Sequence, residues 1–386
     1  MSKEKRRVPK LRFPGFTEDW EQRKLNEFLS VSNLKNAENK YNKKDVLSVS
    51  GDYGIVNQID FQGRSFAGAS VSNYGVVEKG DIVYTKSPLK LNPYGIIKTN
   101  RLNNGIVSTL YAIYKTKENC DSKFIEHYFN LDSRLNQYLK PLVNKGAKND
   151  MKVSSENALI GEVCFPKITE QVLIADLLDC LDIYITLHQR KLNNLKLKKK
   201  ALLQKLFPKN GERYPELRFP GFTDAWEQRK LSEVVAINPK TELPDEFKYV
   251  DLESVVGTNL LGFQVIKKEN APSRAQRLAS YGDVFYQTVR PYQRNNYLFE
   301  NVDKDMVFST GYAQLRSRLD SYFLLTLVQN DNFVKVVLDN CTGTSYPAIN
   351  GSELGKITVQ IPPNEVEANQ IGKIFRRIDK SITLHQ

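Results

Sequence analysis

Two loop-like stretches, each following a Gly-Asp strand pattern, carry the side chains best suited to specific contacts. The first stretch follows Gly80-Asp-Ile-Val-Tyr84 and the second follows Gly282-Asp-Val-Phe-Tyr286. Both mix Lys or Arg with Asn or Gln and with Tyr. Arg can bind the O6/N7 edge of guanine at two points, and Asn or Gln can bind adenine in the same way. Lys and Tyr more often hold phosphates, so these stretches predict contacts to nucleic acid.

The candidate contact residues form three groups. They are Lys86, Lys90, Asn92 and Tyr94 in the first stretch, Arg290, Tyr292, Gln293, Arg294 and Asn295 in the second, and Lys145, Lys148 and Tyr346 in a further strip, where Lys145-Gly-Ala-Lys-Asn149 loosely matches Gly343-Thr-Ser-Tyr346. We expect base-edge contacts from Arg290, Gln293, Arg294, Asn295, Lys86, Lys90 and Asn92. The stretches differ between the two halves, as expected if each half reads a different sequence. An ordinary polar loop remains the alternative for both.

The rest of the sequence offers no pattern for catalysis or cofactor binding. It lacks a Gly-rich loop followed by Lys-Ser/Thr, a GxGxxG after a strand, an HExxH and a GxSxG. Asn92-Pro-Tyr94 is superficially similar to the Asn-Pro-Pro-aromatic motif of amino-methyltransferases, but it has only one proline. Beside His127, the only histidines are His188 and His385, whose helical spacing favours packed core positions over ligands. We therefore expect a binding protein with no catalytic residue, metal or cofactor of its own.

The composition favours a polyanion as partner. The chain has 386 residues, a net charge of +12 and a pI near 9.2. This length is sufficient for two domains with separate cores. No apolar stretch approaches the roughly 18 residues of a membrane span, and the first residues lack the apolar segment of a secretion signal. The four cysteines include no CxxC pair, which indicates a reduced, cytoplasmic setting.

An entry phrase and a closing phrase each occur twice. LRFPGFTEDWEQRKL at 11–25 returns as LRFPGFTDAWEQRKL at 217–231, and LDIYITLHQ at 181–189 returns as IDKSITLHQ at 378–386. Between the phrases the halves share only weaker similarities, such as the two Gly-Asp patterns. Because the copies lie much farther apart than the repeats of a solenoid, the chain is predicted to contain two related domains in tandem. A repeated scaffold with different interiors is typical of two binding domains that differ in specificity.

Short strand patterns mixed with helical patterns predict two α/β domains. The strand patterns cover 45–50, 81–85, 105–114, 283–289, 306–309 and 357–361. The helical patterns cover 122–138 and 321–338. We predict a mixed α+β fold with a first domain at 1–166, a central helix at 167–210, a second domain at 211–363 and a distal helix at 364–386 that looks cut short.

A coiled-coil pattern runs through both helical closing segments. The apolar seam positions, which alternate in steps of four and three, are Ile174, Leu178, Leu181, Ile185, Leu192, Leu195, Leu202 and Leu206 in the first copy and Ile371, Phe375, Ile378 and Ile382 in the second. At ~1.5 Å per residue, a helix over 174–206 is roughly 50 Å long. The alternative is a long core helix in an all-α domain, which the strand-rich neighbours disfavour.

The two helices could pack antiparallel, which would give the repeat an approximate two-fold axis. The domains would then lie at opposite ends of a rod and could read two half-sites separated by an unread spacer. One turn of DNA measures roughly 34–36 Å, so such a rod has a suitable length. The second copy stops at Gln386, so the seam positions from Ile174 to Ile185 would lack a partner.

Taken together, these residues resemble the specificity subunit of type I restriction-modification enzymes. The resemblance rests on LRFPGFTxxWEQRKL before each domain, on the Gly-Asp strand within it, and on ITLHQRKLxxLKxxKKxLLQKLF after it, and it spans essentially the whole chain. It implies two target recognition domains that read a split sequence in double-stranded DNA. It also implies modification subunits, of which two are expected, that use S-adenosylmethionine to methylate adenine. Restriction subunits would supply ATP- and Mg-dependent translocation and cleavage, and none of this chemistry would reside on this chain.

Two alternatives from other classes stay open. A stand-alone nuclease or methyltransferase would bind S-adenosylmethionine, or cut DNA alone with magnesium. A coiled-coil adaptor would form salt-insensitive protein complexes without binding DNA, whereas phosphate contacts make affinity fall steeply with salt.

Overall fold

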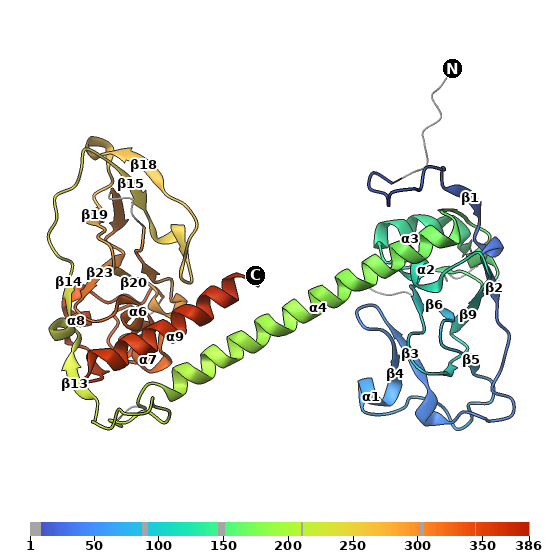
Figure 1. The fold of residues 1–386 in the computed structure, drawn as a ribbon, viewed down its shortest axis with the longest axis horizontal. Coiled ribbons are helices and arrows are strands. Elements are labelled where there is room, and N and C mark those ends of the chain that lie inside the picture. Colours follow the sequence, from blue (N-terminus) through green and yellow to red (C-terminus); the bar gives the residue numbers. More distant parts are fainter. Residues whose placement is uncertain are drawn as a thin grey trace, which may run out of the picture. The chain divides into compact units, whose positions relative to one another are not determined.

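The computed structural model describes residues 9–86, 92–145, 151–209, 211–301, 305–343 and 345–385. The chain divides into two compact units, of which unit 1 ends at Ile185 and unit 2 begins at Thr186. The division falls inside the longest helix, α4 (Ile168–Lys205), so each unit includes one portion of that helix. Both units mix short strands with helices, which agrees with the predicted fold class (Figure 1).

Unit 1 is built on a four-stranded antiparallel sheet in the order β2-β9-β6-β7. Its strands are β1 (Glu21–Lys24), β2 (Leu29–Val31), β3 (Leu47–Ser50), β4 (Gly54–Asn57), β5 (Gly75–Val77), β6 (Ile82–Thr85), β7 (Ile97–Thr99), β8 (Gly105–Val107), β9 (Tyr111–Thr116), β10 (Asn144–Lys145), β11 (Met151–Lys152) and β12 (Glu162–Phe165). Its helices are α1 (Gln58–Gln62), α2 (Ser122–Phe129), α3 (Asp132–Leu139) and the first part of α4. The main core lies between this sheet and the helices, where Tyr84, Tyr114 and Phe124 are buried together.

Unit 2 repeats this sheet in the order β14-β23-β20-β21 and adds a second four-stranded sheet, β18-β15-β22-β19. Its strands are β13 (Glu227–Lys230), β14 (Val235–Ile237), β15 (Glu246–Val250), β16 (Val255–Val256), β17 (Asn259–Leu260), β18 (Gln264–Lys267), β19 (Ala275–Leu278), β20 (Val284–Gln287), β21 (Tyr297–Leu298), β22 (Met306–Ser309), β23 (Tyr312–Ser317) and β24 (Thr358–Ile361). Its helices are α5 (Leu231–Val234), α6 (Ser321–Gln329), α7 (Asp331–Asp339), α8 (Gly351–Lys356) and α9 (Glu365–Thr383). The main core includes Trp226, Phe323 and Phe375.

The repeated entry phrase forms the same structure in both units. Its strand pairs antiparallel with the strand just before the long helix, β1 with β12 and β13 with β24. Its arginine binds a glutamate in the first turn of that helix through two hydrogen bonds. Arg12 binds Glu170 at 2.7 and 2.8 Å, and Arg218 binds Glu367 at 2.8 and 2.9 Å. Two parallel bonds of this kind fix orientation as well as distance, so the phrase ties the two ends of each unit together.

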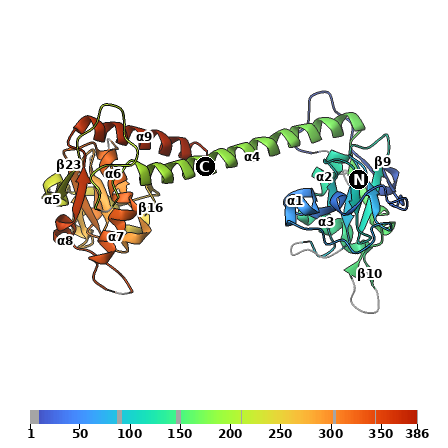
Figure 2. The ribbon, with the colours of Figure 1, turned by 90° about the horizontal axis from the view of Figure 1, so that it is seen from below.

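Unit 2 holds α9 antiparallel to the second part of α4. The two views agree on this arrangement (Figures 1 and 2), and three contacts along the pair give its direction. His188 contacts His385, Lys199 forms an ion pair with Asp379 at 2.6 Å, and Phe207 lies against Phe375. As the position along α4 increases, the partner's position along α9 decreases.

The predicted seam residues fall into two groups. Half-buried or buried ones are Ile174, Leu178, Leu192, Leu195 and Leu202 on α4, Leu206 directly after it, and Ile371, Phe375, Ile378 and Ile382 in α9. Leu181 and Ile185 are instead exposed at 47% and 66%, in the stretch that the sequence predicted to lack a partner. The prediction that the two histidines are packed in a core is wrong, because His188 is exposed and the rings touch each other at the surface.

Three sequence-predicted elements are divided in the structure. Residues 105–114 are two strands, β8 and β9, because Tyr111 N donates to Ser108 O and closes a turn between them. The pattern at 122–138 is split into α2 and α3, and the pattern at 321–338 into α6 and α7. At the second break, the Asn330 side chain accepts a hydrogen bond from Asn332 N and caps the new helix.

Candidate nucleic-acid interface

The Gly-Asp pattern is a structural turn that leads into each candidate loop. Asp283 is buried and accepts two hydrogen bonds from Arg316, at 2.8 and 2.9 Å, and one from Gln314 at 2.6 Å. Asp81 accepts from Glu78 N and lies 3.7 Å from Lys115, and its burial raises the pKa of the carboxyl group. These carboxylates position the start of β6 and β20 and do not lie in an open catalytic site.

The loop after β20 holds two arginines in an unusual backbone conformation. Arg290 and Arg294 have φ angles of +55° and +57°, and they flank a single 3-10 turn over Pro291–Gln293. Non-glycine residues rarely adopt this left-handed conformation, which is often found where the surrounding structure imposes a functional geometry. Here the two strained residues turn the chain sharply on either side of the 3-10 turn, between β20 and β21.

Buried amides fix the shape of this loop. Asn296 accepts from Gln287 N at 2.8 Å, and Gln287 donates from its side chain to Gln293 Oε1 at 2.8 Å. Gln287 also accepts from Asn295 N, and the Asn295 side chain accepts from Gly257 N at 2.8 Å. Thus Gln293 and Asn295, both predicted to reach base edges, have intramolecular partners in this structure.

The two arginines of the loop have different surroundings. Arg294 donates to Asp331 at 2.6 Å and to the Gln329 carbonyl at 3.2 Å, so it ties the loop to the start of α7. The guanidinium of Arg290 lies over the ring of Tyr346, 4.7 Å from its centroid. Tyr346 is 64% exposed and Tyr292 is 50% exposed. Arg290, Tyr292 and Tyr346 therefore form a surface group, which we call the Arg290 cluster.

A second loop supports this cluster from the side. Pro347 O accepts from Arg290 N at 2.8 Å, and Thr288 O accepts from Ile349 N at 3.0 Å. Thr342 and Ala348 form mutual backbone hydrogen bonds at the base of the second loop. Two segments far apart in the sequence thereby meet, and both carry predicted contact residues. A cation stacked on an exposed aromatic ring suits a nucleic-acid surface, because both groups can stack on bases or face phosphates.

In unit 1, fewer of the predicted contact residues can be placed. Asn92 is only 8% exposed and donates to Asp132 at 2.9 Å, which is a structural position. Tyr94 is half-buried, and its carbonyl accepts from the buried Tyr84 hydroxyl. Gly95 allows this close packing, since a Cβ there would lie 1.7 Å from Thr85 O. Lys86 is half-buried, and burial lowers its pKa. Lys90, Lys148 and the side chain of Lys145 lie outside the described residues.

Sequence reasoning missed an exposed aromatic group on the β3–β4 side of unit 1. Tyr53 and Phe61 are exposed and in contact, with ring centroids 5.4 Å apart. Nearby in the sequence, Arg64 lies over the exposed ring of Phe66, 4.6 Å from its centroid. The sequence signal that could have revealed this group is the occurrence of Tyr53, Phe61, Arg64 and Phe66 within a short stretch. It resembles the aromatic and basic mixture of the predicted loops.

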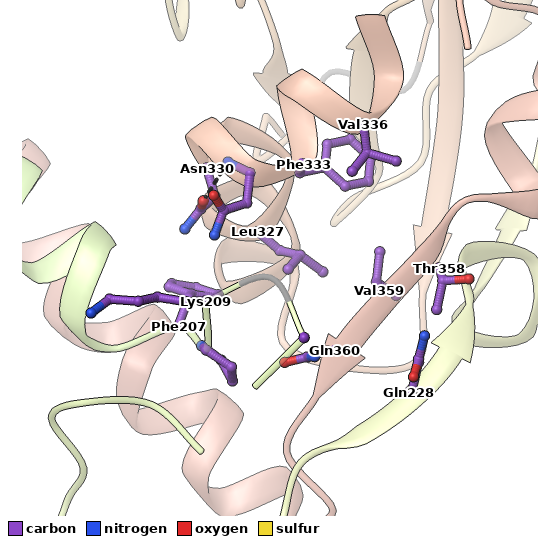
Figure 3. Close-up of a pocket in the computed structure, with 13 residues that line it drawn as sticks. Phe207, Lys209, Gln228, Leu327, Asn330, Phe333, Val336, Thr358, Val359 and Gln360 are labelled. Atoms are coloured by element: carbon purple, nitrogen blue, oxygen red, sulfur yellow. Dashed lines mark hydrogen bonds between the residues drawn. The ribbon is translucent and has the colours of Figure 1, made fainter. Parts of the chain in front are cut away.

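A cavity of ≈ 180 Å³ in unit 2 is lined by none of the residues of the Arg290 cluster; Figure 3 shows its lining. Leu327, Asn330 and Phe333 line it on one side, while Val359 and Gln360 of β24 line the other. Gln360 Oε1 is buried without a hydrogen-bond partner in the described part of the chain. Lys209 is the only lining side chain with a full charge, so the cavity offers no acid–base pair. It belongs to the repeated frame.

The family of the second half follows from a comparison with family models. Residues 223–386 match the model described as "Type I restriction modification DNA specificity domain". The match covers most of unit 2 and less than half of the chain. Unit 1 repeats the entry phrase, the strand pair, the arginine–glutamate contact and the central sheet of this specificity domain. This similarity favours DNA recognition in a type I restriction-modification system as the function of the chain.

Three solved structures are similar to this chain. The type I restriction-modification S subunit from M. genitalium is 13% identical, covers 98% of this chain and 94% of its own, and has a TM-score of 0.56. The HsdS subunit from Thermoanaerobacter tengcongensis is 17% identical, with coverages of 98% and 92% and a TM-score of 0.44. A chain from a study of type I R-M complex assembly and conformational transition is also 17% identical, with coverages of 98% and 94% and a TM-score of 0.45. The first of these supports a shared fold for this specificity chain.

No helix in the described part of this specificity chain is both long and apolar enough to cross a membrane.

Proposed function

We propose that each unit binds one half of a split DNA target and that the chain performs no catalysis itself. Partner modification subunits, two of them by analogy with the two units, would methylate adenine with S-adenosylmethionine. Restriction subunits would use ATP and magnesium to translocate and cleave the DNA. The observation that carries this proposal is the contrast between frame and loops: the entry phrase and its contacts are repeated, whereas the loops after β6 and β20 differ in sequence.

The charge and surface chemistry support DNA as the ligand. The chain carries a net charge of +12, which favours approach to a polyanion. The Arg290 cluster presents a guanidinium and two exposed aromatic rings from loops that buried amides hold in place. A reading side chain must be presented in a fixed geometry, because the cost of ordering it on binding would otherwise reduce affinity.

An exposed apolar row on α4 supports protein partners. Leu177, Leu181, Tyr184 and Ile185 are all about half exposed or more, and they follow one another at helical spacing. Apolar side chains grouped on one helix face are typical of a surface that another protein covers. This observation favours assembly with modification subunits, and it also suits the coiled-coil adaptor role.

The decisive experiment reconstitutes the chain with its modification subunits and maps methylated adenines across a genome. We expect one bipartite motif with an unspecified spacer. Replacing residues 24–166 with the matching segment of a relative should change only one half of the motif. The matched exchange of residues 230–361 should change only the other half.

Four results would contradict this proposal. The first is a motif without a spacer, and the second is a change in both halves after either exchange. The third is methylation or cleavage by the purified chain alone, with S-adenosylmethionine or magnesium, which would identify it as an enzyme. A salt-insensitive complex with protein partners but no DNA binding would identify an adaptor.

A further inference from the structure

A polar cleft in unit 2 has no role in the structure described so far. It measures ≈ 380 Å³ and lies between β19 and the two loops that support the Arg290 cluster. Its polar lining includes Asn238, Arg277, Thr288, Thr310 and Asn350. Most of these side chains have a structural partner: Asn238 accepts from Gln314 N, Thr288 donates to Gly311 O, and Asn350 caps α8. Arg277 is the charged member of the lining.

Arg277 lies in the wall of this cleft. It lies in β19 opposite Phe308 of β22, next to a register shift between Ala275 and Arg277. Its neighbours Ala275 and Leu278 pack into a core, so the backbone at Arg277 is fixed. Its Nε is buried and has no hydrogen-bond partner in the described part of the chain, and burial lowers its pKa. A buried donor that lacks a partner is unfavourable. An anion that enters the cleft would therefore provide the hydrogen-bond acceptor that the Nε of Arg277 lacks.

The strand pairing identifies the residue of unit 1 that is equivalent to Arg277. Phe308 directly precedes Ser309-Thr310, and Val107 directly precedes Ser108-Thr109. The residue paired with Phe308 is Arg277, and the residue paired with Val107 is Gly75. Unit 1 therefore has no side chain where unit 2 has the cation. A Cβ at Gly75 would lie 2.4 Å from the Ile113 side chain.

Unit 1 brings a different cation to the corresponding place. Tyr84 pairs with Ala112 and Tyr286 pairs with Ala313, so these tyrosines are equivalent. Two residues later, Lys86 in unit 1 corresponds to Thr288, which lines the cleft in unit 2. Lys86 is half-buried, and burial lowers its pKa. Each unit thus has one half-buried cation in this region of its sheets, Arg277 of β19 in unit 2 and Lys86 just after β6 in unit 1.

We propose that this cleft is a seat for one backbone phosphate of the bound DNA, held by Arg277 in unit 2 and by Lys86 in unit 1. This inference rests on the proposed function. A phosphate is present at every position of any target, so two units that read different bases can both need one at the same place. Arg and Lys both serve a phosphate, whereas a guanine edge favours Arg and its paired donors. The Thr310 hydroxyl on the same wall adds a neutral donor for a phosphate oxygen.

The phosphate seat has a different role from the Arg290 cluster. It fixes the position of each unit on the backbone, and the cluster then meets the bases in that register. Sequence patterns predicted that Lys86 contacts a base edge. Under the present proposal Lys86 instead contacts the DNA backbone.

The test compares Arg277→Gln, Arg277→Lys and Arg229→Gln in the complex reconstituted with modification subunits. Arg229 is an exposed arginine of the frame strand β13 and serves as the control for loss of charge. Affinity for the mapped target is measured between 50 and 200 mM salt. Loss of one phosphate contact reduces the salt slope by about 0.9, so the wild-type complex should lose about 3.5-fold more affinity over this range than Arg277→Gln. Arg277→Lys should restore the slope, Arg229→Gln should keep it, and the methylation motif should stay the same in all three.

Several results would overturn the phosphate seat while leaving the proposed function intact. One is an unchanged salt slope for Arg277→Gln in a complex that still recognises a bipartite target. Another is a change at a single base pair of the motif, which would make Arg277 a base reader. Lys86→Gln gives the same comparison in unit 1. Thermal unfolding of each variant identifies misfolding, and Arg277→Gln should unfold no earlier than the wild type because it removes a half-buried cation whose Nε lacks a hydrogen-bond partner in the described part of the chain. If the wild-type complex shows no bipartite target, the proposed function itself fails.

Discussion

The buried Arg218–Glu367 pair provides a direct test of how the repeated frame is held together. Glu367 lies in the first turn of α9, and its side chain is only 1% exposed. Arg218 donates to both of its oxygens at 2.8 and 2.9 Å from the entry phrase. In Arg218→Met, the carboxylate would remain buried beside a helix N-terminus but without its guanidinium partner. Breaking a buried ion pair from one side typically costs about 3–5 kcal/mol, and we expect about 3 kcal/mol because Arg218 keeps an exposed edge.

The assay is thermal unfolding of the full chain followed by calorimetry. For a unit of this size, each kcal/mol shifts the midpoint by roughly 2–4 °C, so the transition of unit 2 should fall by roughly 6–12 °C. The double variant Arg218→Met/Glu367→Met removes both charges and should recover most of the loss, since an apolar pair can replace a buried ion pair. Arg229→Met removes an exposed arginine paired with Glu227 and should change stability by less than about 1 kcal/mol.

Two outcomes would refute this reasoning. If Arg218→Met unfolds within about 1 °C of the wild type, the pair does not hold the frame. If the double variant is as unstable as the single variant, the loss comes from packing of the arginine side chain and not from the unpaired carboxylate. Arg12→Met gives the equivalent comparison for Glu170 in unit 1.

Three further predictions concern single side chains. Arg290→Gln should leave the thermal midpoint unchanged but cost ~1–3 kcal/mol of binding free energy at one base pair of the target. Asn295→Ala should cost about 1 kcal/mol of stability, because its bond to Gly257 N is lost, and should leave the motif unchanged. Binding to a panel of single-base variants of the target checks both. Partial burial, Lys191 and His188 lower the pKa of His385 below 6.5. The unfolded state therefore binds more protons than the folded state as pH falls through that value. The helix pair should lose stability between pH 7.5 and 5.5, and unfolding of His385→Asn should depend less on pH in that window. Burial raises the pKa of Cys120 to about 12, so iodoacetamide at pH 8 should label the exposed Cys180 in the folded chain and Cys120 only after unfolding, as mass spectrometry can show.

Local patterns predicted elements well where one signal decided the structure. Strand β22 covers 306–309 as the apolar run and its turn residues indicate, and the strand after each Gly-Asp begins one residue after the aspartate. The breaks inside the helical patterns were missed because neither contains Gly or Pro. They depend on caps such as Asn330, whose side chain also donates to Leu203 O of α4. That contact joins residues 127 positions apart and has no local signature.

In the candidate site, too, residue types predicted part of the structure and tertiary contacts decided the rest. Residue type pointed to Arg290 and Arg294 equally, and only the fold separates them, because Asp331 reaches Arg294 and Tyr346 reaches Arg290. Asn92 looked like a base reader in the sequence, but α3 brings Asp132 to it and buries it. Arg277 gave no sequence signal, since its importance follows from the strand pairing that sets it opposite Phe308 and from the cleft that it lines together with Thr310.

The physical separation of frame and loops would allow one scaffold to carry the two specificities that we propose. The frame is held by contacts between distant parts of the chain, such as the strand pairs and the arginine–glutamate pairs, and these are nearly identical in the two units. The loop after β20 is fixed mainly by its own amides, with Gln287 bonding to Gln293 and Asn296. The equivalent position in unit 1 is Thr85, whose hydroxyl accepts from Ile96 N, and the sequence that follows it is different. Because each loop is fixed locally, a substitution that changes the bases it meets need not disturb the pairs that hold the frame. Interactions at distant, independent sites add in free energy, and loop and frame variants should therefore combine additively.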